Sequence, residues 1–438
     1  MKLLKFFLLA LFDTRGWTTE MNVTGISEID AAIPNFWADS IVPDATRKGF
    51  WGRLSGKEGS AMPVIDKTGQ LKQKGDYITF NTIAQLMGNG VTGESVLKGG
   101  EEKLAIGSFS VQADIVRHAV AVSRKSTLQA NFDEVQITKN LLTDWFARKM
   151  DGDIFTDVLG SSAVSTMYGG SATDVSGLNS TDAQYFGPSE ITKVRLALQR
   201  QGATPIKINA DQGIEEPVYG LVMGEIESYY LHQNTAFVQS IRDAWQRYAG
   251  KGANNPIFNG AIGIYDNMLL YNYRSLLPIP QGTPLRPETT LSATLVTAGT
   301  TAYVGVAASS NTDADYTLFF ASSGSLQIGD EIISYSGKTV STFTGLTRGV
   351  SGTTGAQHTA GALVTQRNVS SVIGFGAGAI YRAIPENAKP IGDSDDYGAQ
   401  IGLGIEAYYG HAAFKDALRG KSPGLVICKV YSANPIGI

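Results

Sequence analysis

The sequence contains only one cysteine, Cys428, among its 438 residues. A single cysteine excludes an intrachain disulfide framework and a zinc site built from four cysteines. Cys428 lies in the apolar run 425–430, where it is expected to be a small buried hydrophobic side chain. This cysteine usage is typical of a chain that folds in a reducing compartment.

An excess of positive charge is also missing. The chain has 36 Lys and Arg against 40 Asp and Glu, a net charge of −4 and a pI of about 5.7. A dedicated DNA- or RNA-binding protein normally carries a basic excess that neutralises phosphates. We therefore expect any nucleic acid near this protein to be contained rather than bound by sequence.

The residue patterns of common catalytic and metal sites are absent. The four histidines, at 118, 232, 358 and 411, are far apart in sequence, and no Gly-x-Ser-x-Gly elbow occurs. Glu101-Glu102 and the acidic run 393–396 resemble acid/base carboxylates or calcium ligands, but we interpret them as solvated acidic loops. The string Gly88-x-Gly90-x-x-Gly93 does not open a helix, so it is not a dinucleotide fingerprint. No catalytic, cofactor or metal site is expected.

No apolar run is long enough to span a bilayer, which takes about 20 residues. The run 3–12 is interrupted by Lys5, is followed by Asp13 and Arg15, and lacks a small-x-small cleavage site. We interpret it as a short arm, or as an upstream extension of a chain that could also start at Met21, rather than as a signal peptide. No membrane association is expected.

What is present indicates an α+β protein. The length predicts two or three domains, and the 50 glycines indicate many turns and close backbone contacts. Apolar residues recur every three to four positions over 133–159, which predicts a long helix with Asp133 as N-cap and Gly160 as the stop. At 1.5 Å per residue this helix would be about 40 Å long.

Other stretches predict strands and shorter helices. Residues 77–80 and 109–115 alternate as half-buried strands do, and the glycine-rich segment between them predicts a long hairpin loop. Further along, the pattern predicts a helix over 189–201 with Ser189 as its cap, a strand at 218–223, a helical stretch from 229 to 245 and a strand at 260–270.

Composition changes over residues 287–367, where charge is sparse and Thr, Ser, Gly and Ala dominate. Short β runs are expected at 301–306, 317–321, 331–335 and 342–346, which together predict a small all-β module. A proline cluster at 278, 280, 284 and 287 precedes the module. Because residues 372–381 return to the earlier α+β pattern, we interpret the module as an insertion in a host domain.

Several stretches, in order, resemble the N4-like family of phage major capsid proteins, which have the Hong Kong 97-type capsid fold. They cover most of residues 30–284 and 368–435, and no single motif is diagnostic by itself. The stretches are Gly75-Asp-Tyr-Ile-Thr-Phe80, 86–97, 100–104, Val111-Gln-Ala-Asp-Ile-Val-Arg-His118, Asn254-Asn-Pro-Ile-Phe-Asn-Gly260 with Gly263 and Tyr265, Ile373-Gly-Phe-Gly-Ala377, and Asp395-Asp-Tyr-Gly398 with Gly410 and Lys415. Within the module, 329–335, 346–354 and 358–364 resemble a short β motif of phage virion and tail proteins.

The resemblance implies a domain division: an N-terminal arm (1–60), an extended hairpin loop with its return strand (61–122), a peripheral domain with a long spine helix (123–214), the first part of an axial domain (215–286), an inserted β-rich Ig-like module (287–367), and the rest of the axial domain with a return to the peripheral domain (368–438). The hairpin is expected to overlap a neighbouring subunit. The module is expected to project from the outer surface.

It also implies a function without catalysis. The chain would be the major capsid protein of a tailed double-stranded DNA bacteriophage, assembling in the host cytoplasm through pentamers and hexamers into the icosahedral head of the virion. Scaffolding, portal and decoration proteins are further expected partners, and the packaged DNA would be enclosed without sequence-specific binding. The subunit-contact candidates are Trp37, Trp51, Asp76, Lys98, Glu101, Glu102 and Arg117.

Two alternatives stay open at this point. One is a phage tail or decoration protein that uses the β module for surface binding, although the 133–159 helix does not suit a fibrous stalk. The other is a secreted carbohydrate-active enzyme with an Ig-like accessory domain, which would require a true signal peptide and aromatic subsites.

Overall fold

The computed structural model describes residues 49–68, 77–83, 88–93, 98, 101–104, 106–123, 134–178, 184–207, 217–240, 261–273, 282–305, 315–395, 400–416 and 419–435. The chain divides into two compact units. The smaller unit comprises residues 1–45, 116–143 and 388–407, and the larger comprises 46–115, 144–387 and 408–438.

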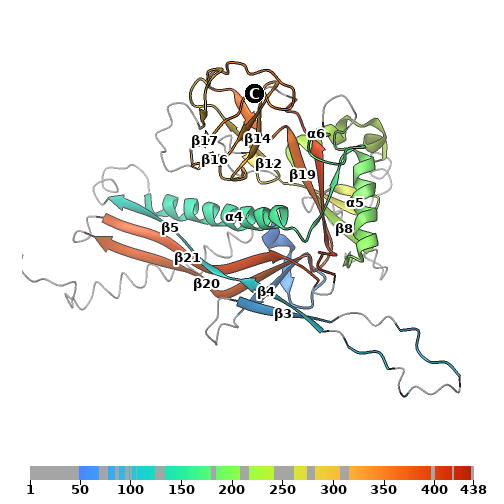
Figure 1. Cartoon of the computed structure of the whole chain (residues 1–438). Coiled ribbons are helices and arrows are strands. Elements are labelled where there is room, and N and C mark those ends of the chain that lie inside the picture. The colour runs from blue at the N-terminus through green and yellow to red at the C-terminus, as the bar shows by residue number, and fades with distance from the viewer. Residues whose placement is uncertain are drawn as a thin grey trace, which may run out of the picture. The chain divides into compact units, whose positions relative to one another are not determined.

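A mixed seven-stranded sheet forms the centre of the larger unit (Figure 1). Its order is β6-β22-β19-β8-β10-β9, with β7 paired to β8. β19 is antiparallel to both β22 and β8, whereas β10 runs parallel to β8. The strands are β6 (Ser165–Tyr168), β7 (Ile206–Lys207), β8 (Pro217–Met223), β9 (Ala261–Tyr265), β10 (Met268–Asn272), β19 (Val369–Phe375) and β22 (Leu425–Tyr431).

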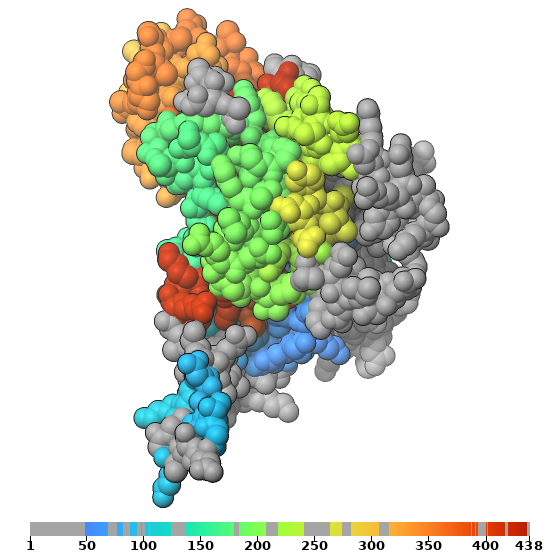
Figure 2. Space-filling view, turned by 90° about the vertical axis from the view of Figure 1, so that its right-hand side faces the viewer, coloured from blue at the N-terminus to red at the C-terminus, as the bar shows by residue number. Residues whose placement is uncertain are grey.

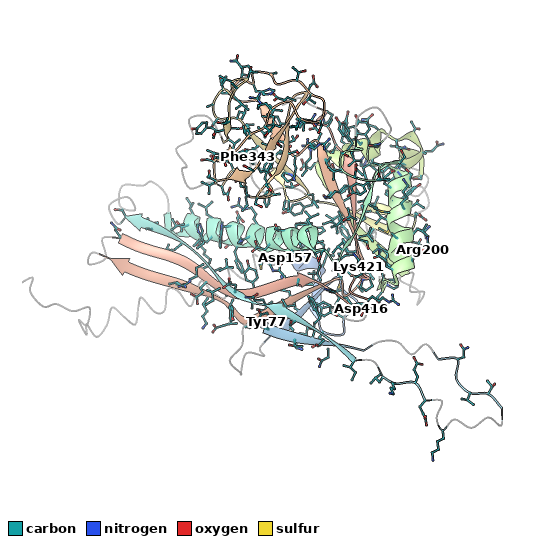
Figure 3. The ribbon with its side chains drawn as sticks, viewed as in Figure 1. Tyr77, Asp157, Arg200, Phe343, Asp416 and Lys421 are labelled. Carbon is teal, nitrogen blue, oxygen red and sulfur yellow. The ribbon has the colours of Figure 1, made fainter. Side chains whose placement is uncertain are left out.

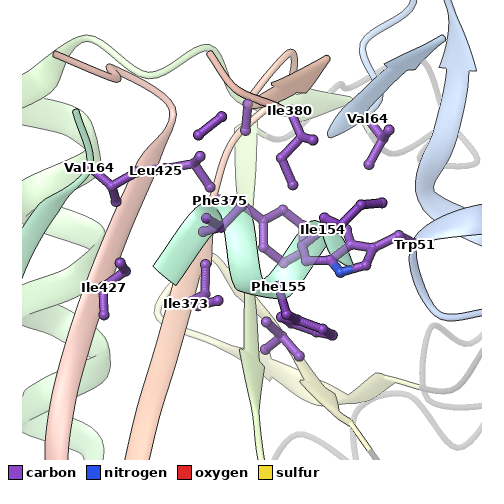
Figure 4. Packing of buried hydrophobic residues seen from close by; sticks show 14 of the residues in the cluster. Trp51, Val64, Ile154, Phe155, Val164, Ile373, Phe375, Ile380, Leu425 and Ile427 are labelled. Carbon is purple, nitrogen blue, oxygen red and sulfur yellow. The ribbon is translucent and has the colours of Figure 1, made fainter. Parts of the chain in front are cut away.

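Both faces of this sheet are buried, which explains why its strands read as near-continuous apolar runs. On one face, α5 (Pro188–Gln201) packs Ile191, Val194 and Leu198 into an apolar cluster with residues of β8, β10 and β22. On the other face, Phe375 of β19 packs with Trp51 and Phe155 (Figure 4).

The shorter elements differ from the sequence prediction in detail. α5 begins at Pro188 after Gly187, and Ser189 does not cap it, because proline occupies the first turn, where its missing N–H is not needed. The helical stretch beyond 229 is interrupted: α6 (Glu225–Gln233) ends where Asn234 becomes extended, and its continuation beyond residue 240 lies outside the described residues.

The single strand predicted at 260–270 is wrong, because this segment is a hairpin of β9 and β10. Asp266 and Asn267 have φ values of 49° and 58° and connect the two strands. Positive φ at both central residues is the geometry of a tight two-residue hairpin turn, and Asp and Asn tolerate it better than most residues.

The long helix is confirmed as α4 (Glu134–Gly160). Its first residues belong to the smaller unit, and the rest, from Asp144 on, belongs to the larger. In the larger unit, Phe146, Ile154, Phe155 and Val158 are buried. The proposed N-cap Asp133 lies outside the described residues.

A five-stranded sheet has the order β1-β2-β20-β21-β5. A 3₁₀ helix, η1 (Trp51–Leu54), leads into β1 (Ser55–Lys57), which runs parallel to β2 (Val64–Thr68). β2 in turn runs parallel to the start of β20 (Ile380–Asp395). Two more strands, β21 (Gln400–Ala413) and β5 (Asp114–Ser123), complete the sheet.

Residues 282–365 form two small sheets around their own core. One has the order β11-β12-β18-β14-β15 and the other β13-β17-β16; Leu326, Ile333 and Phe343 lie at the centre of the core. The strands are β11 (Gly282–Thr283), β12 (Arg286–Thr290), β13 (Thr301–Tyr303), β14 (Gly324–Ile328), β15 (Glu331–Tyr335), β16 (Gly337–Lys338), β17 (Thr342–Thr344) and β18 (Leu363–Thr365).

Two of the β runs predicted in this segment match strands closely, at 331–335 and 342–344. The run expected at 317–321 is wrong, because residues 316–319 form a turn. β14, which pairs with β15 along its whole length, was not predicted, because Ser325 and Gln327 gave it no clear apolar signal.

The contact between β8 and β19 generates a stability prediction. A Cβ at Gly220 would lie 2.2 Å from Cε2 of Phe375, inside a core with no space to yield. We expect Gly220→Ala to destabilise the chain by about 1–3 kcal/mol or more through overpacking. The control Gly160→Ala adds a methyl group where nothing lies within 4 Å, and it should leave stability unchanged or slightly higher. Urea unfolding of both variants checks this; equal unfolding midpoints would contradict it.

Candidate functional site

Among the described residues of the larger unit, the two most exposed large apolar side chains, Ile106 and Tyr77, lie on the hairpin of β3 (Tyr77–Ile83) and β4 (Ile106–Gln112). The two strands pair antiparallel, with Tyr77 opposite Gln112 and Phe80 opposite Phe109. One face is anchored: Ile78, Phe80 and Val111 are buried with Ala383 of β20. The hairpin is therefore fixed at its base and can present its other face.

The opposite face of the hairpin bears no charged side chain among its described positions. It carries Tyr77, Thr79 and Asn81 on β3 and Ile106, Ser108, Ser110 and Gln112 on β4. Tyr77 is 59% exposed and Ile106 66% exposed; Figure 3 shows Tyr77 on this hairpin. This face therefore consists mainly of hydroxyl and amide groups, with one exposed apolar side chain towards each end.

The loop that joins β3 and β4 continues this surface. Leu104 is 56% and Val91 38% exposed, and in Figure 2 the described loop residues, in light blue, project away from the body of the larger unit. Gly90 and Gly93 have φ values of 67° and 70°, which only glycine adopts readily. Gly90 and Gly93 therefore allow the backbone of this loop to adopt conformations that other residues rarely adopt.

The subunit-contact candidates in this loop are solvent-accessible. Lys98, Glu101 and Glu102 are all exposed. Glu102 also has a role within the chain, because its Oε2 accepts a hydrogen bond of 2.6 Å from the Gly88 N–H and ties the two sides of the loop together. Their contact with a neighbouring subunit stays a prediction.

The remaining candidates are placed differently. Arg117 on β5 is 66% exposed and lies 3.4 Å from Glu406 of β21, both in the smaller unit; such an exposed pair contributes about 0–1 kcal/mol. Trp51 is fully buried in the chain's own core, so its side chain is not available to another subunit, because three aromatic rings of the same chain surround it. Asp76 and Trp37 lie outside the described residues.

Charged side chains of α4 contact β21 in the larger unit. Asp153 accepts hydrogen bonds from Tyr409 of β21 (3.0 Å) and from Lys149 (2.5 Å). His411 lies 3.6 Å from Asp157, which Figure 3 marks on α4. Burial lowers the pKa of His411 and raises the pKa of Asp157, while the attraction between the two groups opposes both shifts.

A buried carboxylate holds the β-rich segment together. Glu331 is 1% exposed at its side chain, and Arg348 donates to it from Nε and Nη2 at 2.7 and 2.6 Å. The backbone N–H groups of Gly349 and Ala356 donate to it at 3.0 Å each, and His358 Nε2 lies 2.8 Å away. Burial alone would raise the pKa of Glu331, but these hydrogen bonds outweigh it and lower the pKa to about 2.

The hydrogen bonds to Glu331 connect the three stretches of the β motif, 329–335, 346–354 and 358–364. Glu331, Arg348 and His358 come from three of its stretches, and the carboxylate fixes the irregular chain from 345 to 358, which has few strand hydrogen bonds of its own. No role for these three residues could be predicted from the sequence alone. The signal that could have revealed it was the acidic pair Asp330-Glu331 in a segment that is sparse in charge and also holds Arg348 and His358.

The part of the chain that the structure describes shows no cluster of three or more His, Cys, Asp or Glu side chains placed to hold a metal ion. In the larger unit, His232 lies on α6, His358 contacts Glu331 and His411 lies beside Asp157, so each of these histidines has different neighbours. Among the described residues, no helix is both long and apolar enough to cross a membrane.

The comparisons with known proteins agree with this picture. A family model described as phage capsid protein matches residues 26–283, more than half of the chain. No curated protein sequence matches the chain. A capsid of Ralstonia phage GP4 aligns with a TM-score of 0.59 at 18% identity, covering 88% of this chain and 91% of the other.

Two further solved structures are similar. The head structure of Helicobacter pylori bacteriophage KHP40 has a TM-score of 0.55 at 14% identity, with 87% and 92% of the two chains covered. The capsid of cyanophage Pam1 has a TM-score of 0.55 at 16% identity, with 89% and 93% covered. At such identities the likeness shows the fold, and it confirms the predicted α+β fold of the Hong Kong 97 type.

The Glu331 cluster generates a prediction with a matched control. Glu331→Gln removes the charge that Arg348 faces in a buried site, which typically costs about 3–5 kcal/mol. We expect hydrogen exchange over 324–335 to accelerate strongly while 369–375 stays protected. Asp330→Asn removes the same charge from the exposed neighbouring residue and should change neither; an equal effect of the two variants would contradict the assignment.

The same carboxylate gives a pH dependence of defined sign. Because the pKa of Glu331 falls from 4.5 to about 2 on folding, its stabilising contribution is present above pH 4.5 and is lost as the pH falls towards 2. In Glu331→Gln, hydrogen exchange over 324–335 should therefore not accelerate further through loss of this charge as the pH falls from 4.5 towards 2.

Proposed function

The chain belongs to the phage capsid protein family, and from this premise we propose that it is the major capsid protein that assembles through pentamers and hexamers into the icosahedral head of a tailed double-stranded DNA bacteriophage. The protein is a structural component of the virion. The observation that carries the proposal is the family match over more than half of the chain, on a chain with the capsid fold. Assembly would take place in the host cytoplasm, with scaffolding, portal and decoration proteins as further partners.

The hairpin of β3 and β4 is the proposed contact between neighbouring subunits. Its support is the contrast between its two faces: Phe80 and Val111 are buried on one, while Tyr77 and Ile106 stay exposed on the other. Lys98, Glu101, Glu102 and Arg117 would add polar contacts at the rim, where each exposed ion pair contributes little but the shell repeats it many times.

We also propose the finer division of the chain that the resemblance implies, with membership of the N4-like branch. The division comprises the arm (1–60), the extended hairpin loop with its return strand (61–122), the peripheral domain around α4 (123–214) and the first part of the axial domain (215–286). An Ig-like insertion (287–367) follows, and then the rest of the axial domain with a return to the peripheral domain (368–438). The insertion is supported by a core of its own, built by Leu326, Ile333 and Phe343, and by its ends, since Glu288 and Thr365 lie opposite each other in adjacent strands.

Charge supports the proposed role of a DNA container. A net charge of −4 gives the wall of a shell little attraction for packed phosphates, so enclosed DNA would not be held by many salt-dependent contacts. The proposal therefore requires no sequence-specific recognition of DNA.

The proposal is tested by electron microscopy and mass photometry of the purified chain at high concentration. Closed shells, or discrete pentamers and hexamers, are the expected result. A strictly monomeric or trimeric, elongated particle under all salt and scaffold conditions would count against it and would favour a tail or decoration protein.

The hairpin contact has its own test. We expect Ile106→Asp to abolish shells, because a charge would replace a side chain that is 66% exposed in the single chain and buried in the assembled contact. Tyr303→Asp makes a comparable change at a side chain that is 56% exposed in the β-rich insertion, and it should still form shells. Circular dichroism establishes that both variants are folded; shells from Ile106→Asp would contradict the contact.

The insertion should be dispensable for assembly. Residues 289–364 would be replaced by Asn-Gly. This two-residue hairpin turn would connect Glu288 to Thr365, which already lie opposite each other in adjacent antiparallel strands. We expect shells of lower mass by mass photometry. A folded, shortened chain that forms no shells would show that the insertion contributes to subunit contacts.

A further inference from the structure

Three tyrosines from distant parts of the larger unit meet at one place on its surface. Tyr185 precedes α5, Tyr230 lies on α6 and Tyr431 ends β22. Each of these three residues is partly exposed. The residue beside each tyrosine is buried in one shared apolar cluster, to which Phe186, Leu231 and Val430 belong. The core beneath the three tyrosines therefore holds their positions.

Hydrogen bonds fix the same positions from the backbone side. Tyr185 forms an isolated parallel β-bridge with Tyr431, whose N–H donates to the C=O of Gln184 at 3.1 Å. The Tyr230 hydroxyl donates to the C=O of Ala433 at 2.8 Å. One ring is thus carried by a helix and another by a segment bound to β22, so the fold sets the separation of the two rings.

Tyr185 and Tyr230 form the closest ring contact among the described residues. Their ring centroids are 4.3 Å apart, and the ring planes are inclined by 33°. The other contacts in this cluster are longer and edge-on: Tyr431 meets Tyr185 at 5.3 Å and 72°, and Tyr229 meets Tyr230 at 5.5 Å and 75°. Within the cluster, only Tyr185 and Tyr230 therefore place the faces of two phenol rings against each other.

Phenol rings in this arrangement are suited to oxidative coupling. A one-electron oxidant converts a tyrosine into a tyrosyl radical, whose unpaired electron is shared by the hydroxyl oxygen and the ring carbons beside it. Two radicals couple when these carbons meet, and fixed rings need no diffusive encounter for that. Burial raises the pKa of both hydroxyls, that of Tyr230 to about 12. Each ring therefore carries its proton at neutral pH and loses it together with the electron.

We propose that Tyr185 and Tyr230 are a site of oxidative modification, at which a haem peroxidase with hydrogen peroxide joins the two rings into dityrosine. Each phenol gives up one electron and one proton. The two radicals form a carbon–carbon bond between ring carbons ortho to the hydroxyls, and the hydrogen on each of these carbons then moves to the phenolic oxygen. One hydrogen peroxide is reduced to two molecules of water, so atoms and electrons balance.

The bond would join the chain before α5 covalently to α6. A cross-link between residues that are far apart in sequence restricts the unfolded chain more than the folded one. Oxidation at this site would therefore strengthen a contact that is otherwise held by ring packing and hydrogen bonds. The modification is a property of the single chain and does not depend on the proposed function.

Peroxidase treatment of the full chain, followed by proteolysis and mass spectrometry of the monomer fraction, tests the site. We expect one main cross-linked peptide pair, joined through Tyr185 and Tyr230 and lighter than the sum of its parts by two hydrogen atoms. Because the link lies within one chain, its yield should not depend on protein concentration. Absence of this link, or an equal yield of links between other tyrosines, would overturn the proposal.

Conservative variants assign the link to the two rings. Tyr185→Phe and Tyr230→Phe each remove one hydroxyl, so the dityrosine fluorescence of the monomer fraction should be lost in both. Tyr229→Phe removes the adjacent hydroxyl of a residue that is 45% exposed, and this variant should keep the fluorescence. Circular dichroism establishes that all three variants are folded. The proposal fails if Tyr185→Phe or Tyr230→Phe retains the signal, or if Tyr229→Phe loses it.

Discussion

The packing of Phe375 against Trp51 and Phe155 is the contact on which the larger unit depends. These rings come from β19, η1 and α4, and the surrounding cluster adds residues of β2, β7, β8, β10, β20, β21 and β22. Segments separated by more than 300 residues meet there, so the cluster can form only when the sheet, the helix and the beginning of the described chain are all in place. At about 25 cal/mol per Å² of buried apolar surface, a few such rings contribute as much as the whole margin of stability of a typical domain.

Once this core is fixed, polar groups decide the details of the layer between α4 and the strands. Asp151 is buried and accepts hydrogen bonds from the Phe50 and Trp51 N–H groups. Asp153 accepts a hydrogen bond from Tyr409, and the more exposed Asp157 lies 3.6 Å from His411. Apolar packing is not directional, whereas hydrogen bonds to carboxylates require particular distances and angles. The charged side chains therefore set the register of helix and strands, at the energetic cost of burying ionisable groups.

The β3–β4 hairpin and the β-rich segment lie outside the main core and differ in how they bury their side chains. The hairpin buries one face of a two-stranded ribbon and leaves apolar groups exposed on the other, which is unfavourable for an isolated molecule and useful for one that is repeated in a shell. The β-rich segment 282–365 buries a core of its own, and its central carboxylate, Glu331, accepts hydrogen bonds on both oxygens.

The sequence by itself determined the elements whose pattern is long or strictly periodic. The helix at 134–160 follows from apolar spacing over seven turns, the hairpin strands from alternation, and the β-rich segment from its sparse charge. The α+β class and the capsid resemblance followed from the order of such segments and motifs. The scattered histidines and the single cysteine led to the expectation of no metal site, and the structural function was what the family resemblance implied.

Only the tertiary structure decided where single side chains go. In the sequence, Trp51 has the pattern of a surface aromatic in a polar segment, yet its side chain is buried. The burial could not be predicted, because its partners Phe155 and Phe375 are more than 100 and 300 residues away in sequence. Ser189 is a good cap by type, but Gly187 and Pro188 determine where the helix begins. Asp151 and Glu331 gained their roles from backbone N–H groups of other elements, and no local pattern records such partners, since hydrogen bonds between distant segments exist only after the chain has folded.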